Sequence, residues 1–270
     1  MIKSYGINKS VVVKTREELH LEEFYNLGYT VIEEAVSSSE LIELRSELDK
    51  VYKIQEDDFG KENLRLIHEE NLARIPLAYS ETYARLASRK ELMPYIEKIL
   101  GNFFVLHLQN GIINMPNEEH HQSFWHRDLP YQNWTSSEPL ACNLFYCVDD
   151  FSAETGGTFL LPFSNQFEAA PSAQYMEKHS IQVCASAGSV VLFNSMLFHK
   201  AGFNKSRDKI RRGVNHVYVK PIINQQIDIP SVLNGKYADD PFLSMLFGYQ
   251  TRLSKSVNEY RQLRLDKSKK

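Results

Sequence analysis

The stretch Gly188-Ser189-Val190-Val191-Leu192-Phe193 joins a turn to an apolar run, and Leu197-Phe198-His199 follows it closely. Apolar runs that are rich in β-branched and aromatic residues and bounded by turn residues are typical of buried strands. The hydrophobic period becomes strand-like from Phe103 onward, and we expect strands at 103–113, 140–148, 158–161, 181–183, 190–193 and 213–219. Many short strands in succession predict a jelly-roll barrel in this part of the chain.

The first hundred residues carry helical patterns instead. Thr15-Arg16-Glu17-Glu18 and Ser37-Ser38-Ser39-Glu40 have the form of capping boxes, in which a hydroxyl and a glutamate satisfy free N–H groups at the start of a helix. The second box leads into an apolar stripe at helical spacing, made of Leu41, Leu44, Leu48 and Val51. We expect a short strand at 29–32, and a surface loop or lid in the polar section at about 55–75.

Together these patterns predict one domain over residues 1–270 that is mainly β with flanking helices. Its centre is expected to be a double-stranded β-helix of the jelly-roll or cupin-like type at about 103–220. A helical N-terminal part at about 1–102 would buttress this core, and residues 221–270 would form a C-terminal helical extension.

The composition excludes several classes of protein. With 43% hydrophobic and 24% charged residues the chain is typical of a globular protein, and its net charge of −3 gives no reason to expect a nucleic-acid partner. No apolar stretch approaches the roughly 18 residues of a membrane span. The three cysteines form no Cys-x-x-Cys pair, so we expect free thiols in the core and a cytoplasmic protein. The sequence does not indicate an oligomeric state.

His126 and Asp128 are the residues that point most directly to chemistry. Side chains two apart on a strand project from the same face, so both can bind one metal ion. His-x-Asp alone is a weak signal, because an exposed loop can contain both residues. Together with His199 they provide two imidazoles and one carboxylate, the facial triad of non-haem Fe(II) oxygenases with open positions for substrate and dioxygen. His216 is the main rival to His199.

Arg211 and Arg212 come directly before the strand expected at 213–219 and lead into it. An arginine one strand beyond the last metal ligand can reach back into the barrel and bind a carboxylate through two parallel hydrogen bonds. Neighbours on a strand face opposite ways, so we expect one of the two to be a solvated edge charge.

The same residues also match a motif of a different class. His126-Arg127-Asp128-Leu129-Pro130-Tyr131-Gln132-Asn133 agrees with the His-Arg-Asp-Leu-x-x-x-Asn catalytic loop of protein kinases. Phosphoryl transfer by a kinase also needs a Gly-rich loop over the phosphates, and none of the 12 glycines forms Gly-x-Gly-x-x-Gly. The sequence therefore argues against a kinase.

The chain resembles the phytanoyl-CoA dioxygenase-like (PhyH) family of Fe(II)/2-oxoglutarate-dependent oxygenases, over approximately residues 20 to 220. The resemblance is carried by Phe24-x-x-x-Gly28-Tyr29-x-Val31, Leu41-x-x-Leu44-x-x-x-Leu48, Trp125-His126-x-Asp128, Gly157-x-x-x-x-Pro162-x-Ser164, Gly188–Phe193, His199 and Asn204-x-Ser206. It implies that His126, Asp128 and His199 are the catalytic iron ligands, and that Fe(II), 2-oxoglutarate and O2 take part in the reaction.

The resemblance also implies where 2-oxoglutarate binds. Arg211 is the expected partner of its far carboxylate, with Arg212 as the alternative, and Asn110 is expected to contact the cosubstrate ahead of Gln109. A small hydroxyl residue is usual two positions after the second histidine, where this chain has Ala201, so one cosubstrate hydrogen bond is in doubt.

The expected reaction is hydroxylation of a C–H bond in a small-molecule substrate, with release of succinate and CO2. Halogenating relatives replace the carboxylate of the triad, and Asp128 is present here. Three aromatic residues flank the first ligands and either line the substrate pocket or pack the barrel mouth: Trp125, Tyr131 and Trp134. The alternative functions are a zinc-dependent hydrolase and a non-catalytic cupin-like binding module on the same triad.

Overall fold

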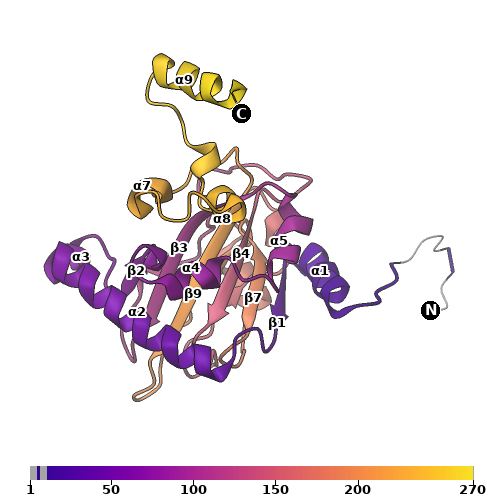
Figure 1. Cartoon of the computed structure of the whole chain (residues 1–270). Coiled ribbons are helices and arrows are strands. Elements are labelled where there is room, and N and C mark those ends of the chain that lie inside the picture. Colours follow the sequence, from indigo (N-terminus) through magenta and orange to yellow (C-terminus); the bar gives the residue numbers. More distant parts are fainter. Residues whose placement is uncertain (1–4, 7–10, 270) are drawn as a thin grey trace.

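The computed structural model describes residues 5–6 and 11–269. In this part of the chain two antiparallel sheets face each other, and helices cover the outer face of the larger one (Figure 1). The larger sheet has the strand order β1-β7-β4-β9-β3-β2, and the smaller has the order β6-β5-β8. The strands are β1 (Tyr29–Ile32), β2 (Leu72–Arg74), β3 (Val105–Asn114), β4 (Ala141–Cys147), β5 (Phe159–Leu160), β6 (Ile181–Gln182), β7 (Val190–Asn194), β8 (His199–Lys200) and β9 (Arg211–Val219).

The strand predictions hold to within about two residues at each end. The helical N-terminal part also supplies strands, since β1 and β2 form the two edges of the larger sheet. Strand β8 was not predicted, because two residues are too few to show a period. It pairs with β5 and carries His199, so this short strand is decisive for the site.

Both predicted capping boxes are present. Thr15 caps α1 (Arg16–Leu27) and Ser37 caps α2 (Ser38–Phe59), each with its glutamate bonding back to the backbone of the capping residue. The prediction of a loop or lid over 55–75 was wrong. Helix α2 continues to Phe59, and α3 (Lys61–Leu66) and β2 follow it. The section is polar because it lies on the solvent side of the helix, where Lys53 pairs with Asp57 at 2.7 Å.

The remaining helices complete the outer layer and the C-terminal part. They are α4 (Glu81–Ala87), α5 (Met93–Leu100), α6 (Ala173–His179), α7 (Ile229–Leu233), α8 (Pro241–Leu246) and α9 (Val257–Ser268), with short 3-10 helices η1 (Pro76–Ala78), η2 (His121–Ser123), η3 (Ser164–Gln166) and η4 (Tyr249–Thr251). Helices α7 and α8 pack on the main body, whereas α9 projects away from it (Figure 1). Among the described helices, none has the length and apolarity needed to cross a membrane.

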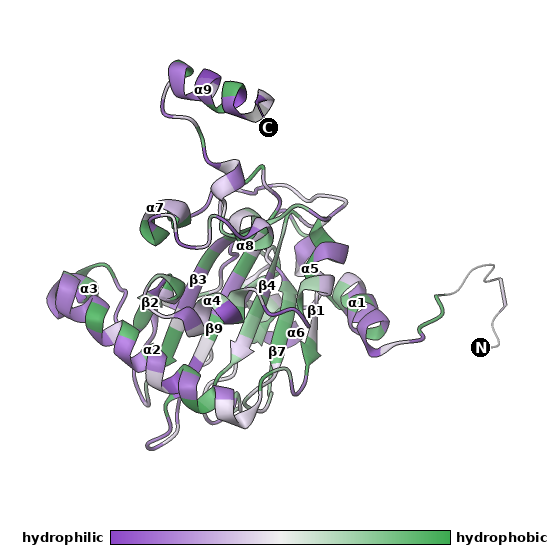
Figure 2. Cartoon of the chain, viewed as in Figure 1, coloured by the Kyte–Doolittle hydropathy of each residue, from purple (hydrophilic) through white to green (hydrophobic). Residues whose placement is uncertain are grey.

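Strand alternation divides the core into an outer and an inner layer. On β4, Cys142 and Leu144 face the helices, while Phe145 and Cys147 face the smaller sheet. The helix-covered strands are accordingly apolar over most of their length, and the solvent face of α2 is polar (Figure 2). Cys184 was expected in the core but is exposed. It lies after the last residue of the short strand β6, beyond the part that packs between the sheets.

The inner layer is apolar at both ends and polar in the middle. One apolar group lies around Phe145 and Phe193, and another lies around Leu108 and Val217. Between them the strands turn polar side chains inward, so the fold itself provides a polar chamber inside the β core.

The contact between α2 and the larger sheet generates a stability prediction. Leu48 is fully buried, and a Cβ added to Gly111 of β3 would lie 2.2 Å from its Cδ1 atom. We expect Leu48→Ala to lower the free energy of unfolding by about 2–5 kcal/mol, because it removes buried methyl groups and leaves a cavity. Ile42→Ala, on the exposed side of the same helix, should change it by less than about 0.5 kcal/mol. Urea denaturation of both variants checks this, and equal losses would contradict the packing.

Candidate active site

The site is organised by an antiparallel pairing of His126 with His199. The backbone N–H of His126 donates to the carbonyl of His199 at 2.9 Å, and the reverse hydrogen bond is 3.0 Å long. Two residues opposite each other in such a pair carry their side chains on the same side. The two imidazole rings consequently lie with their centroids 4.2 Å apart.

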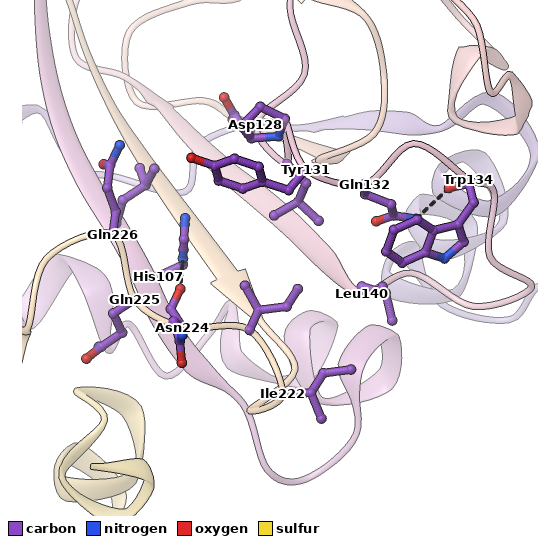
Figure 3. Close-up of a pocket in the computed structure, with 14 residues that line it drawn as sticks. His107, Asp128, Tyr131, Gln132, Trp134, Leu140, Ile222, Asn224, Gln225 and Gln226 are labelled. Carbon is purple, nitrogen blue, oxygen red and sulfur yellow. Dashed lines mark hydrogen bonds between the residues drawn. The ribbon is translucent and has the colours of Figure 1, made fainter. Parts of the chain in front are cut away.

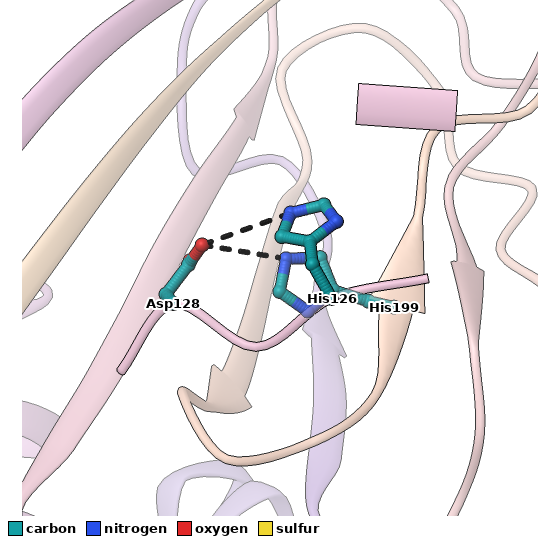
Figure 4. A group of neighbouring side chains, drawn as sticks. All are labelled: His126, Asp128 and His199. Atoms are coloured by element: carbon teal, nitrogen blue, oxygen red, sulfur yellow. Dashed lines mark ion pairs between the residues drawn. The ribbon is translucent and has the colours of Figure 1, made fainter. Parts of the chain in front are cut away.

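Asp128 completes a group of three possible metal ligands. It lies two residues after His126, and its backbone N–H bonds to the carbonyl of Ser195 at 3.1 Å. The Oδ1 atom of Asp128 is 3.8 Å from Nε2 of His126 and 3.6 Å from Nε2 of His199 (Figure 4). One ligand atom from each residue lies within 4.8 Å of the others, a spacing that suits a single metal ion.

Backbone carbonyls hold both rings in the orientation that metal binding needs. The Nδ1–H of His126 donates to the carbonyl of Phe124 at 2.8 Å, and that of His199 donates to the carbonyl of Leu197 at 2.9 Å. Each ring therefore keeps its Nε2 lone pair for a ligand, as in protein metal sites where the second nitrogen is fixed by an acceptor. Burial, with the neighbouring His126, lowers the pKa of His199 and keeps its ring neutral.

Two asparagines orient the carboxylate from the other side. The side-chain amides of Asn143 and Asn215 both donate to Oδ2 of Asp128, at 2.5 and 3.3 Å. Asn143 is fixed in turn by a hydrogen bond from Ser195. Burial alone would raise the pKa of Asp128, but the imidazoles and these amides outweigh it and lower the pKa. One carboxylate oxygen is thus held by amides, and the other faces the histidines.

Arg211 lies in a narrow cleft that His126 and His199 also line. Its guanidinium packs over the ring of Phe151, 4.6 Å from the ring centroid. The side chain is fully buried, and none of its three nitrogens has a hydrogen-bond partner in the described part of the chain. Burial lowers the pKa of Arg211 to about 10, so it remains a cation at neutral pH. A buried cation without a partner is costly, and the cleft is therefore suited to an anion.

Three other sequence candidates lie on the opposite face of the larger sheet and do not reach this site. Arg212 pairs with Asp49 at 2.9 Å and with Asp149 at 3.0 Å. The amide of Gln109 bonds to the backbones of Leu77 and Tyr83 and contacts the ring of His216. Strand alternation is the cause, since each is adjacent in sequence to a residue that faces inward.

The remaining candidates divide between the site and its surroundings. Asn110 lines a cavity together with His126 and Asp128, and its Oδ1 accepts a hydrogen bond from Arg74 at 3.2 Å. Tyr131 and Trp134 line a larger cavity that also includes Asp128. Trp125 lines neither of these cavities. It packs against an apolar group around Phe198. Because His126 and Asp128 point inward, the residues directly before and between them point away.

Sequence reasoning missed several polar residues of the site. Asn143 is a single amide within the apolar run of β4. Asn215 lies four residues after Arg211 on β9, so strand alternation turns Asn215 and Arg211 to the same, inner face. Arg127 was also missed. Its guanidinium donates to the backbone carbonyls of Ser164, Phe167, Glu168 and Met196 and stacks on Phe198, which holds the ligand segment against the barrel.

Comparison with known proteins relates this site to a family. An uncharacterized protein of Mycobacterium tuberculosis, Rv1501, is 29% identical over 247 residues, covering 87% of this chain and 88% of its own. The structure of HygX from Streptomyces hygroscopicus with nickel and 2-oxoglutarate bound is similar at a TM-score of 0.59 and 19% identity, over 81% of this chain and 92% of HygX. The non-heme alpha ketoglutarate dependent epimerase SnoN from nogalamycin biosynthesis is similar at a TM-score of 0.59 and 18% identity, over 76% of this chain and 81% of SnoN.

The structural similarities confirm the predicted double-stranded β-helix. The family assignment comes from the sequence, because the family model described as phytanoyl-CoA dioxygenase (PhyH) matches residues 24–213, well over half of the chain. That range includes all three clustered ligand candidates and Arg211. The chain belongs to the phytanoyl-CoA dioxygenase (PhyH) family, and it is an oxygenase-type enzyme of the iron/2-oxoglutarate class.

Proposed function

We propose that this chain is an Fe(II)/2-oxoglutarate-dependent dioxygenase that hydroxylates a C–H bond of a small-molecule substrate. In this proposal His126, Asp128 and His199 hold the iron, and Arg211 binds the far carboxylate of 2-oxoglutarate. The observation that carries the proposal is the unpartnered guanidinium of Arg211 in the cleft that both histidines line. A dicarboxylate with one end at the metal and the other at Arg211 supplies the charge that this arginine lacks.

The donor set fits Fe(II). Two neutral imidazoles and one carboxylate leave positions open for a chelating keto acid and for dioxygen. When bound, iron and 2-oxoglutarate supply the oxidising chemistry, in which dioxygen is consumed and succinate and CO2 are released. The task of the chain is to fix these ligands, to orient the substrate and to keep water away from the reacting centre.

The chain's own residues divide this task between them. Asn143 and Asn215 hold Oδ2 of Asp128, so the carboxylate presents Oδ1 to the metal position. Thr158 lines the Arg211 cleft together with Ala201 and provides a hydroxyl group where position 201 has none. The free space beside Arg211 is only 10 Å³. Gln122 and His126 line both this cleft and the neighbouring cavity of 310 Å³.

The alternative functions do not account for Arg211. A zinc hydrolase needs three ligands and a metal-bound water, and a binding module needs no further charge. Neither explains why a fully buried cation is kept beside the triad without an acidic partner. The cosubstrate carboxylate explains it.

Substitution of each arginine tests the cosubstrate site. We expect Arg211→Met to weaken 2-oxoglutarate binding roughly 30-fold or more, because the loss of one partner of a buried charge pair costs about 2–5 kcal/mol. Arg212→Met is the matched control: its guanidinium is used by Asp49 and Asp149 on the other face, so 2-oxoglutarate affinity should not change. Calorimetric titration of the zinc-loaded proteins measures both. Equal affinities of wild type and Arg211→Met would refute the assignment.

The asparagine pair generates a prediction on metal affinity. Asn143→Ala removes the 2.5 Å hydrogen bond that orients Asp128, and we expect zinc or Fe(II) affinity to fall about 10- to 100-fold. Asn102→Ala, at an exposed position before β3, is the control and should bind metal as the wild type does. Competition with a chromophoric chelator gives the affinities. Unchanged metal binding in Asn143→Ala would mean that Asp128 needs no such support.

A further inference from the structure

A second cavity, of 630 Å³, adjoins the triad and is not used by the proposed metal and cosubstrate sites. Residues between Leu129 and Trp134 form one wall and residues 222–226 form the other (Figure 3). His107 and Leu108 of β3 also line the cavity. Asp128 belongs to this cavity as well as to the triad. A small molecule bound here would therefore lie next to the metal position.

A β-bulge directs His107 into this cavity. The pairing of β3 with β9 shifts by one residue between Leu106 and Leu108, so His107 is the extra residue. Leu106 packs against the helices and Leu108 faces the interior, which regular alternation would not allow. Bulges of this kind are common beside active sites, where they redirect a side chain. The result is that His107 and Leu108 both line the cavity.

The backbone around His107 fixes which ring nitrogen is available. Its Nδ1–H donates to the carbonyl of Asn224 at 2.8 Å, and the N–H of Gln226 donates to the carbonyl of His107 at 3.1 Å. With Nδ1 protonated, Nε2 of the neutral ring is an acceptor. No described residue donates a hydrogen bond to Nε2. His107 thus offers the cavity one fixed acceptor, which fits a hydroxyl or N–H group of a ligand.

The charged residues of the cavity also restrict which ligands it can bind. Among the described residues its lining includes no lysine or arginine, and its one acidic residue, Asp128, has Oδ2 bonded by two amides and Oδ1 facing the histidines of the triad. The phosphates of a coenzyme A thioester, or a free carboxylate, would find no cation there; proteins usually bind such groups with arginine, lysine or helix N-termini. Leu129, Leu140 and Ile223 provide apolar walls instead.

The mouth of the cavity carries apolar surface that is open to solvent. The exposed fractions are 90% for Tyr131, 52% for Trp134 and 77% for Ile222. These side chains come from both walls of the cavity (Figure 3). Large apolar groups gathered around a concave site are typical of a binding surface for an apolar ligand body.

We infer that the substrate is an uncharged molecule with an apolar or ring-shaped body and a hydroxyl group that donates to Nε2 of His107. This inference rests on the proposed function, because it makes the cavity the substrate site of that reaction. His107 is a specificity-determining residue in it: it touches the substrate but takes no part in the oxidation. Acyl thioesters of coenzyme A, whose phosphates would meet no cation in this lining, are expected to bind more weakly than such a molecule.

Three compounds that share one skeleton test the inference: 4-tert-butylcyclohexanol, 4-tert-butylcyclohexanecarboxylate and 4-tert-butylcyclohexylamine, with octanoyl-CoA as a thioester. Saturation-transfer NMR gives their affinities for the protein loaded with zinc and 2-oxoglutarate, and for the metal-free protein. We expect the alcohol to bind about tenfold more tightly than the other three. In His107→Leu its affinity should fall about tenfold, the size of one lost hydrogen bond. His107→Gln should retain most of the affinity, and His179→Leu, at an exposed position on α6, should retain all of it.

The inference fails if the carboxylate, the amine or octanoyl-CoA binds as tightly as the alcohol. It also fails if His107→Leu binds the alcohol like the wild type, or if none of the compounds binds. The metal-free measurement separates this test from the proposed function. If the metal-free protein prefers the alcohol and the loaded protein does not bind 2-oxoglutarate, the inferred specificity of the cavity stands. Only the proposed 2-oxoglutarate site is then rejected.

Discussion

Two backbone hydrogen bonds exchanged by His126 and His199 are the constraint on which the rest of the site depends. These residues are 73 positions apart in the sequence, and His199 lies on a strand of only two residues. The exchange places both rings on one side of the pair, and the carbonyls of Phe124 and Leu197 then turn each Nε2 toward Asp128. The positions of the two histidines among the three possible metal ligands are thus set by main-chain pairing, which side-chain substitutions disturb little.

Strand alternation on β9 explains how an arginine without a partner can lie next to an arginine in an ion pair. Arg211 and Arg212 are neighbours, but one faces the interior and the other faces α2, where Asp49 and Asp149 neutralise it. Gly213 has no side chain, and a Cβ there would lie 2.6 Å from the ring of Phe145. The glycine therefore leaves room for the rings of Phe145 and Phe151, and Arg211 packs over the second of these. The same strand thus supplies an unpaired arginine to the interior and, through Arg212 and Asp49, an ion pair to the helical layer.

The sequence was sufficient for every described strand except β2 and β8 and for the capping boxes, because those features have local patterns, and the family resemblance implied the clustering of His126, Asp128 and His199. It was not sufficient where contacts between distant segments determine the position of a residue. Asn143 and Asn215 meet at Asp128 only through the register of β4, β7 and β9, and Arg127 binds carbonyls near residue 165. The end of α2 was mistaken for a loop because its exposed face is polar. The sequence analysis left open whether Trp125 lines the substrate pocket or packs the barrel mouth, although alternation from His126 already points it away from the pocket. The bulge that redirects His107 leaves no mark in the sequence.

The most direct test of the account is an anaerobic titration of the metal-free protein with Fe(II) in the presence of 2-oxoglutarate, followed by visible absorption. The central claim is that the His126–His199 pair and Asp128 hold an iron ion to which the keto acid binds. We predict a weak metal-to-ligand charge-transfer band in the wild type and its loss in His199→Ala, with folding of both proteins verified by circular dichroism. The absence of a band in a folded wild-type protein that binds zinc at the same residues would contradict the account.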